Sequence, residues 1–466
     1  MEEQQQQKNQ TVLVLGAGMV AGPLVHYLAG HGYPVIVASR TLARAQKLIE
    51  GTGSHTQARA CDVETEEGKA QLQELIALPE VAVVISMLPY LLHPFAAKTA
   101  LAHSKHFLTT SYVSDAMREL EAEAKEKGLV IINECGVDPG TDHMSAMRVI
   151  HRVRENGGRV TSFLSYCGGL PAPDSNDNPF GYKYSWSPRG VLLASRNAAH
   201  FLRDGKIVDI AGQDLFDNFE VEKIEALDAE VESYPNRNSC QYIDTYGLSA
   251  VKTMIRGTYR YKGWCVSIKK LVDLGFLDLE ERAGLPGKTY PAMIAEMVKE
   301  QKEKKGSASS STAASLKEEV AQLLNVEPDH YAVNNMEWLG LFDENNTIPA
   351  GIKTRLDALC HLMQSKMQYK PGERDMILMK HEFIATYPDD KQEKITCMLI
   401  DYGISNGDTS MSRTVSLPVA IATRLVLEGK YTKPGLSIPI VPELYNPILD
   451  ELETLGIKFV DTAKPL

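Results

Sequence analysis

Residues 11–41 read TVLVLGAGMVAGPLVHYLAGHGYPVIVASRT, and this stretch carries a complete strand–helix–strand pattern. The apolar run at residues 12–15 is too short for a helix and is typical of a strand buried on both faces of a parallel sheet. A helix over residues 23–29, ended by Gly32, and a second strand over residues 35–38 are expected to follow. The stretch therefore predicts an α/β fold with a doubly wound first domain.

The turn between the first strand and the helix reads GAGMVA at residues 16–21, the G-x-G-x-x-A form of the dinucleotide fingerprint. Gly16 permits the tight turn, Gly18 lets the backbone approach a pyrophosphate, and Ala21 lets the helix lie close to the strand. The pyrophosphate would bind the amides at the helix N-terminus. The alternative is an ordinary glycine-rich turn, but its place between a strand and a helix favours a dinucleotide site.

The end of the second predicted strand indicates which dinucleotide binds. An NAD site has a carboxylate about 20 residues after the glycines, where it binds the ribose hydroxyls. Here the sequence is Ser39-Arg40-Thr41, which contains no acid. A guanidinium can hold a 2′-phosphate through two hydrogen bonds, whereas an aspartate would repel it. We therefore predict NADP, against the alternative that Arg40 is only a solvated residue at a strand end.

The composition of the 466-residue chain restricts its class. The length predicts about two to three domains, and 44% hydrophobic with 23% charged residues is typical of a soluble globular protein. A net charge of −11 argues against nucleic acid or membrane as partners, and no apolar run approaches the roughly 20 residues of a membrane span. The polar residues 1–10 resemble neither a signal nor a transit peptide, so we expect a cytoplasmic protein.

The cysteine and histidine spacing predicts no metal site. The seven cysteines contain no C-x-x-C pair, which is typical of reduced thiols rather than a disulfide framework. The 12 histidines show no ligand spacing such as H-x-x-x-H. The cysteines are Cys61, Cys135, Cys167, Cys240, Cys265, Cys360 and Cys397.

The alternation of strands and helices continues to residue 132. Strands are expected at residues 57–60, 81–85, 106–110 and 129–132, the last of which closes the sheet, and helices at residues 64–78, 91–103 and 115–127. Ligands of such sheets bind at the carboxyl ends of the strands, where Leu88, Ser111 and Tyr112 lie. Asp62 either borders the adenine end of a dinucleotide or caps the helix at residues 64–78.

Three charged residues have two interpretations each on sequence alone. Asp138 lies in NECGVDPG at residues 133–140, where composition favours a β-turn that starts at the aspartate. Arg237 in YPNR and Arg260 in RGTYRY alternate with aromatic residues. Such arginines are usually solvated, and the alternative is that they contact a ligand.

The second part of the chain loses the βα alternation. Strands near residues 160–166, 207–212, 231–234 and 258–261 predict an antiparallel or mixed sheet with helices on one side. Residues 271–363 are expected to be mostly helical, with a low-complexity mobile loop or disordered insert at residues 300–315. Residues 375–381 and 395–402 predict a hairpin, and helices at residues 413–428 and 446–456 are expected to return to the first domain.

Taken together, the motifs resemble the saccharopine dehydrogenase family of the NADP-dependent, glutamate-forming type, also called saccharopine reductase. The similarity extends over nearly the whole chain except the first ten residues and the Ser/Ala-rich insert near Gly306. The matching segments are LGAGMV, ASRT, ISMLPYLLHP, TTSYVS, NECGVDPGTDHM, SYCGGLPAP, NPFGYKYSWSPRGVLL, YPNR, RGTYRYKGW, EWLGLF and GERDMILM.

The resemblance implies a fold of three parts and a reversible oxidation. The parts are a Rossmann NADP-binding domain (residues 1–136 with 410–466), a mixed α/β substrate-binding and dimerisation domain (137–275 with 370–409) and an inserted all-helical domain (276–369). The family converts saccharopine, NADP and water to L-glutamate, 2-aminoadipate 6-semialdehyde and NADPH. A homodimer is implied, and the absence of an upstream reductase domain leads us to expect a free-standing enzyme.

The resemblance also assigns roles to residues. Asp138, Tyr112 and Cys167 are the candidate acid–base groups, although Cys167 is equally well a small buried filler and the family enzyme can rely on positioning alone. Substrate contacts fall on Ser111, Tyr112, Asp138, Arg237, Thr258, Tyr259 and Arg260. Cofactor contacts fall on Ala17, Gly18, Met19, Val20, Ser39, Arg40, Thr41, Asp62, Val63, Leu88, Thr110, Ser111, Val137, Asp138, Pro139 and Ser187.

Two other functions remain open from the sequence. One is an NADP-dependent imine reductase that acts on a different amino acid conjugate, such as a carboxynorspermidine-type enzyme. The other is a non-catalytic NADP-binding protein that serves as a redox sensor or scaffold. The intact DPG, YPNR and RGTYRY segments argue against the sensor, because it has no use for a tricarboxylate pocket.

Overall fold

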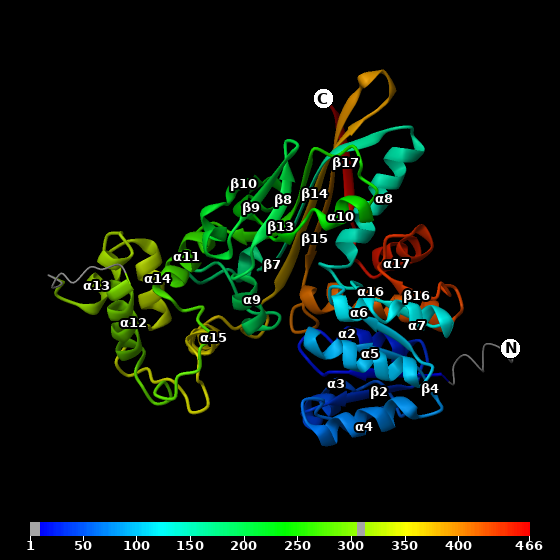
Figure 1. Cartoon of the computed structure of the whole chain (residues 1–466), viewed down its shortest axis with the longest axis horizontal. Helices are drawn as coiled ribbons and strands as arrows, with labels where there is room; N and C mark the ends of the chain where they lie inside the picture. The colour runs from blue at the N-terminus through cyan, green and yellow to red at the C-terminus, as the bar shows by residue number, and fades with distance from the viewer. Residues whose placement is uncertain (1–9, 305–312) are drawn as a thin grey trace. The chain divides into compact units, whose positions relative to one another are not determined.

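The computed structural model describes residues 10–304 and 313–466, and its described part divides into two compact units (Figure 1). Unit 1 contains the chain up to Val160 together with Met379–Leu466, and unit 2 is Thr161–Leu378. The predicted three-part division, with its bounds, stays a prediction. Most of the predicted tail and the centre of the predicted low-complexity insert lie outside the described residues.

Unit 1 is built on a seven-stranded sheet whose neighbouring strands all pair parallel, with the order β16-β6-β5-β4-β1-β2-β3. The alternating strands and helices expected up to residue 132 are confirmed. The expectation that residues 129–132 close the sheet is wrong, because β16 pairs with β6 on its outer side. The strands are β1 (Thr11–Leu15), β2 (Val35–Ser39), β3 (Thr56–Ala60), β4 (Val81–Ser86), β5 (His106–Thr109), β6 (Val130–Ile132) and β16 (Gly435–Ser437).

Helices cover both faces of this sheet, which explains why β1 is buried along its whole length. Leu13 and Leu15 pack in one core with Leu72 and Ile76 of α4 and with alanines of α5. The early helices are α2 (Gly22–Gly30), α3 (Leu42–Leu48), α4 (Glu66–Ala77), α5 (His93–Ala102), α6 (Asp115–Arg118) and α7 (Glu121–Glu126), with a short 3₁₀ turn η1 (Tyr90–Leu92) before α5.

Two helix expectations needed correction. Asp62 does not cap α4, because Thr65 is the N-cap and accepts a hydrogen bond from the amide of Gly68 at 3.0 Å. The side chain of Asp62 instead accepts from the amide of Glu64 at 3.2 Å, as in a local turn. The single helix expected at residues 115–127 is two helices, α6 and α7, and Ser114 caps the first of them.

The C-terminal part of the chain does return to unit 1, as expected. Helix α16 (Ser410–Leu427) lies against α2, the helix that follows the glycine-rich turn. Arg424 on α16 donates from Nε to the Tyr27 hydroxyl at 2.8 Å and also pairs with Glu428 and Glu451. Because Glu451 belongs to α17 (Pro442–Thr454), this one cation joins three helices.

One helix and three strands complete unit 1, although the first of these strands begins at the end of unit 2. Helix α8 (Thr141–Glu155) follows the predicted exit from the sheet, and its Arg152 pairs with Asp461 at 2.7 Å. Strands β14 (Asp375–Thr386) and β15 (Gln392–Tyr402) are neighbours, which confirms the predicted pair. The last strand, β17 (Val460–Pro465), pairs antiparallel with β15 and was not expected from the sequence.

Unit 2 contains a mixed sheet, as predicted. Strand β13 pairs parallel with β7 and antiparallel with β11, which in turn pairs with β10. The strands are β7 (Arg159–Pro171), which starts at the end of unit 1, β8 (Ala199–Arg203), β9 (Lys206–Ile210), β10 (Glu220–Ile224), β11 (Ala229–Pro235), β12 (Arg237–Asn238) and β13 (Thr253–Tyr261). Short helices α9 (Pro188–Ala194) and α10 (Gln241–Thr245) connect them.

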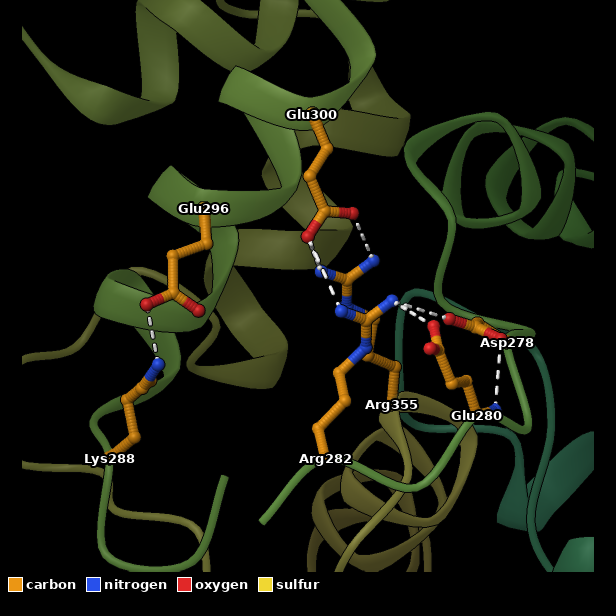
Figure 2. A network of polar contacts seen from close by, with 7 residues as sticks. All are labelled: Asp278, Glu280, Arg282, Lys288, Glu296, Glu300 and Arg355. Atoms are coloured by element: carbon orange, nitrogen blue, oxygen red, sulfur yellow. Dashed lines mark hydrogen bonds and ion pairs between the residues drawn. The ribbon is translucent and has the colours of Figure 1, made fainter. Parts of the chain in front are cut away.

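The helical region of unit 2 is held together by a network of charged side chains (Figure 2). Both guanidinium nitrogens of Arg355 bind the carboxylate of Glu300, at 2.8 and 2.6 Å, and Arg282 also reaches it. Because Arg355 is buried, its hydrogen bonds to Glu300 take the place of hydrogen bonds to water. The helices are α11 (Trp264–Leu274), α12 (Tyr290–Lys304), α13 (Leu316–Leu323), α14 (Tyr331–Leu339) and α15 (Arg355–Lys366).

No helix in the described ranges has the length and apolar character needed to cross a membrane.

Replacing Glu300 tests this network. We expect Glu300→Gln to lower the free energy of unfolding by about 1–3 kcal/mol, because the buried Arg355 loses its counter-charge. The hydrogen bonds from Arg355 hold the pKa of Glu300 below its ordinary value. The stabilisation is therefore present above the ordinary pKa of about 4.3 and is lost as the pH falls through the lowered one.

The matched control is Glu296→Gln, which removes a more exposed pair with Lys288 and should change stability by about 0–1 kcal/mol. Urea unfolding at pH 7 and at pH 3.5 measures both variants. Equal effects of the two substitutions at pH 7 would contradict the proposed difference.

Candidate functional site

The glycine-rich turn after β1 has two glycines with different surroundings. Gly16 has a φ of +102°, and a Cβ added there would lie 3.0 Å from the Met87 carbonyl oxygen. The chain itself therefore requires this glycine. A Cβ on Gly18 would meet no atom within 4 Å, so nothing in the described chain explains the missing side chain. Open space beside an exposed backbone is what a closely approaching pyrophosphate needs.

The N-terminus of α2 leaves its amides available to an anion. Its N-cap is Ala21, no side chain caps it, and no acidic residue lies in its first turn. The exposed Met19 and the partly buried Ala17 and Val20 surround this turn. An uncapped helix N-terminus directs amide groups and a positive dipole at the same point, so the turn fits a dinucleotide pyrophosphate.

Arg40 lies just after β2, and its side chain is 68% exposed. Its guanidinium binds the Glu64 carboxylate at 2.9 Å. Exposed ion pairs of this kind are weak, so a phosphate dianion can displace the carboxylate. Ser39 and Thr41 flank Arg40, and Asp62 and Val63 lie at the end of the adjacent strand β3, so the structure brings these predicted residues to one edge of the sheet.

The carboxyl ends of β4 and β5 carry Leu88, Thr110 and Ser111, all half-buried. Next to them, the Tyr112 hydroxyl donates to Asp138 Oδ1 at 3.1 Å. The structure thus brings together two of the three candidate acid–base groups, which are 26 residues apart. A tyrosine hydroxyl bonded to a carboxylate can pass a proton to or from a ligand amine.

The segment that presents Val137, Asp138 and Pro139 is a tightly closed loop. Gly140 has a φ of +153°, and a Cβ there would lie 2.0 Å from the Gly136 carbonyl oxygen. Glycine is required because the two backbone segments touch. The loop closes immediately before α8, so Asp138 is held at the entrance of that helix.

Three buried groups near this edge were missed by the sequence analysis. His93 contacts Ser86 and Ser111, each at 2.8 Å, and Glu134 contacts His143 at 2.8 Å. All three are nearly inaccessible to solvent. A histidine and a glutamate next to predicted strand ends, in ISMLPYLLHP and NECG, were the available signal.

Arg260 of unit 2 is a buried cation that forms no ion pair with any residue the structure describes. It is 7% exposed, and its guanidinium lies over the rings of Tyr182 (5.1 Å) and Trp264 (5.5 Å). Its Nη1 donates to the Tyr259 carbonyl oxygen at 2.8 Å, and its Nε has no hydrogen-bond partner among the described residues. Within residues 10–304 and 313–466, no carboxylate forms an ion pair with it. Because burial of an unpaired cation is costly, this arginine indicates an anionic ligand.

The strand position of Arg260 separates it from its neighbour Tyr259. Alternate residues of a strand face opposite sides, so Thr258 and Arg260 share one face of β13 and Tyr259 lies on the other. Consistent with this, the Tyr259 hydroxyl donates to Glu222 and its ring lies 5.3 Å from that of Tyr166. A contact of Tyr259 with the same ligand would come from its main chain.

Glu232 positions the helix that follows β13. Its carboxylate accepts the amides of Gly263 and Cys265, each at 2.7 Å, and so caps the first turn of α11. Trp264, the first residue of that helix, packs on Tyr182 with ring centroids 4.8 Å apart. The aromatic pair that holds Arg260 is therefore fixed by a buried carboxylate.

The other predicted residues of unit 2 are more scattered. Cys167 is half-buried and lies beside Thr258, its partner in the strand register. Ser187 is the N-cap of α9 and accepts from the Gly190 amide at 3.1 Å. Arg237 is exposed on the short strand β12. No group of three or more histidine, cysteine or acidic residues in the described ranges is arranged to hold a metal ion.

The parallel sheet, the open glycine turn and the arginine after β2 define a Rossmann-type dinucleotide-binding protein of the NADP class. Residues 12–132 match the family model "Saccharopine dehydrogenase NADP binding domain", and residues 136–457 match "Saccharopine dehydrogenase C-terminal domain". The chain belongs to the saccharopine dehydrogenase family. Both the family and the NADP-binding domain predicted from the sequence are confirmed.

Similar proteins extend over most of the chain. The saccharopine dehydrogenase [NADP(+), L-glutamate-forming] of Schizosaccharomyces pombe is 41% identical over 456 residues, which cover 96% of this chain and 98% of that protein. A crystal structure of apo saccharopine dehydrogenase (L-Glu forming) from Saccharomyces cerevisiae has 38% identity and a TM-score of 0.83, with 98% of this chain and 100% of that chain covered. The mitochondrial alpha-aminoadipic semialdehyde synthase of Rattus norvegicus is 36% identical, and only 47% of its length is covered.

The two glycines of the turn give a matched pair of variants. We expect Gly18→Ala to fold normally and to weaken NADPH binding by about 1–3 kcal/mol, because the methyl group occupies the space of the pyrophosphate. Gly16→Ala should lower thermal stability, because it clashes with the Met87 carbonyl. Fluorescence titration with NADPH and thermal unfolding separate the two effects. A Gly18→Ala protein with wild-type affinity would contradict the assignment of the turn.

Arg40 is expected to select the cofactor. Arg40→Ala should weaken NADPH binding by about 1.5–3 kcal/mol and leave NADH binding unchanged, because only NADPH carries the 2′-phosphate. Glu64→Gln should strengthen NADPH binding by up to about 1 kcal/mol, because the competing carboxylate is removed. Equal losses for NADPH and NADH in Arg40→Ala would show that Arg40 does not bind the phosphate.

Proposed function

We propose that this protein is an oxidoreductase that interconverts saccharopine and L-glutamate plus 2-aminoadipate 6-semialdehyde. In the oxidative direction, saccharopine, NADP⁺ and water give the two products, NADPH and a proton. The observation that carries this substrate is the buried, unpaired Arg260, because a molecule with several carboxylates supplies the anion that the arginine lacks. The names of the similar proteins in two yeasts support the same reaction.

The proposed reaction needs a deprotonated amine and an activated water. NADP⁺, when bound, accepts the hydride from the carbon of the secondary amine. The amine must lose its proton before that transfer, and a water must then attack the resulting imine carbon, which releases the amine of L-glutamate. The Tyr112–Asp138 pair is the proposed acid–base group, since the hydroxyl already donates a hydrogen bond to the carboxylate. Cys167 is a second candidate beside Thr258.

The remaining site assignments extend this proposal. Ser111, Tyr112, Asp138, Arg237, Thr258, Tyr259 and Arg260 are proposed to contact the substrate, with Tyr259 acting through its backbone. The proposed cofactor contacts are those named above on β1, β2, β3, β4 and β5, together with Val137, Asp138, Pro139 and Ser187. We further propose a cytoplasmic homodimer with the three-part domain organisation described above.

The reaction is tested with purified protein, NADP⁺ and saccharopine, by following the absorbance of NADPH at about 340 nm. We expect NADPH formation with saccharopine and its consumption with glutamate plus 2-aminoadipate 6-semialdehyde. A panel of lysine and diamines as amine donors separates this reaction from that of a different imine reductase. NADPH binding without any turnover would support the non-catalytic alternative.

Arg260 is the sharpest single test of the substrate side. Arg260→Met should weaken saccharopine binding by about 2–5 kcal/mol, because the substrate carboxylate is left buried and unpaired. Arg260→Lys should be intermediate, since it keeps the charge and loses the planar fork. Steady-state KM and kcat values measure both variants.

The control is Lys262→Ala, which removes an exposed cation that pairs with Glu230 at 2.7 Å, two residues beyond Arg260. It should leave KM unchanged, and NADPH affinity should be unaffected in all three variants. A wild-type KM in Arg260→Met would contradict the proposed role.

A further inference from the structure

A buried histidine lies between two serines at the carboxyl ends of neighbouring strands. His93 is the first residue of α5, and it is 2% exposed. Its Nδ1 lies 2.8 Å from Ser86 Oγ, and its Nε2 lies 2.8 Å from Ser111 Oγ. Ser111 is proposed above as a ligand contact, whereas the proposed reaction has not yet used His93.

The ionisation state of His93 makes the two serines inequivalent. Burial lowers the pKa of His93 to about 4, so its ring is neutral at pH 7. A neutral imidazole carries one N–H donor and one bare nitrogen acceptor. One serine therefore accepts a hydrogen bond from the ring and the other donates to it.

Thr109 decides which nitrogen carries the proton. Its hydroxyl donates its single proton to the Ser86 carbonyl oxygen at 2.9 Å. Its Oγ1 also lies 3.3 Å from His93 Nε2, where it can act only as an acceptor. Nε2 must then be the protonated nitrogen, and Nδ1 accepts the hydroxyl proton of Ser86.

The direction of the hydrogen bonds from Ser86 through His93 to Ser111 leaves the hydroxyl proton of Ser111 free to bond elsewhere. Ser111 Oγ accepts from His93 Nε2, and in the part of the chain that the structure describes no acceptor takes the Ser111 hydroxyl proton. We propose that His93 is a positioning residue, which orients Ser111 so that its hydroxyl donates a hydrogen bond to an oxygen of the bound ligand. This rests on the proposed function in so far as Ser111 is a ligand contact.

The backbone around Ser111 is held independently of His93. The Ser111 carbonyl oxygen accepts from the Glu134 amide at 3.0 Å and from Asn133 Nδ2 at 3.3 Å. The Glu134 carboxylate accepts the Val113 amide at 3.0 Å. The turn is therefore fixed by the two residues that follow β6, and rotation of the Ser111 hydroxyl is the freedom that remains for His93 to set.

The oxygen that accepts the hydrogen bond from Ser111 can belong to the substrate or to the cofactor. A substrate carboxylate and the carboxamide or phosphate oxygens of the cofactor all accept such a hydrogen bond. Saccharopine KM and NADPH Kd, measured on the same variants, distinguish the two sources. A change confined to KM assigns the acceptor to the substrate, and a change in Kd assigns it to the cofactor.

Asparagine and glutamine substitutions separate the two ends of the imidazole. The Asn side chain reaches as far as Nδ1, so His93→Asn keeps the contact with Ser86 and loses the one with Ser111. The longer Gln side chain reaches the place of Nε2, so His93→Gln keeps a donor to Ser111. We expect His93→Asn to weaken ligand binding about 10-fold and His93→Gln to remain within about threefold of wild type.

A double-mutant cycle with Ser111→Ala tests whether His93 acts through Ser111. We expect the effect of His93→Asn to disappear in the Ser111→Ala background. The control His106→Gln replaces a histidine at the amino end of β5, where it accepts the Val130 amide at 3.0 Å, and should change stability only. Multiplicative effects in the cycle, or equal losses in His93→Asn and His93→Gln, would overturn the proposal.

A measurement on the unmodified protein covers the case in which a His93 variant does not fold. Nitrogen-15 NMR of histidine-labelled protein should show a neutral, Nε2-protonated ring whose signals shift in Ser111→Ala. A proton on Nδ1 would overturn the proposal. The NMR result and the NADPH titration do not require saccharopine turnover, so failure of the proposed reaction is recognised separately.

Discussion

The parallel pairing of the first sheet is the constraint on which the rest of unit 1 depends. Parallel strands end at one edge, so residues that are far apart along the chain meet there. Gly18 follows β1, Arg40 follows β2, Leu88 follows β4, and Ser111 follows β5. The apolar strands are covered on both faces by helices, so this edge is where polar groups can meet a ligand.

The two arginines proposed to bind ligands, Arg40 and Arg260, have opposite surroundings. Arg40 is exposed and holds Glu64 in a pair that costs little to break. Arg260 is buried with its guanidinium over the rings of Tyr182 and Trp264, and no carboxylate among the described residues forms an ion pair with it. The solvated arginine suits a phosphate at the surface, and the buried one suits a carboxylate that is removed from water.

Local sequence patterns predicted most strands and helices of the Rossmann domain. They did not predict which strands pair or which residue caps each helix. Apolar runs and the glycine turn predicted the first six strands of the sheet and most of the helices between them, but not α3. The same patterns did not predict that β16 pairs outside β6, because β16 has only three residues and joins the sheet from more than 300 residues away. Thr65 replaced Asp62 as the cap of α4 because only its hydroxyl reaches the Gly68 amide.

The sequence by itself determined the dinucleotide turn, the cofactor class, the family and the alternation of strands and helices, because these depend on residues close together in the chain. Only the tertiary structure decided that Tyr112 meets Asp138 and that His93 lies between two serines. It also decided that Arg260 is buried without an ion-pair partner in the described part of the chain, while Tyr259 faces the other side of the strand. Those features depend on which side chains enclose a group and remove its water. Burial and hydrogen-bond direction are set by packing between distant segments, and a linear pattern does not record them.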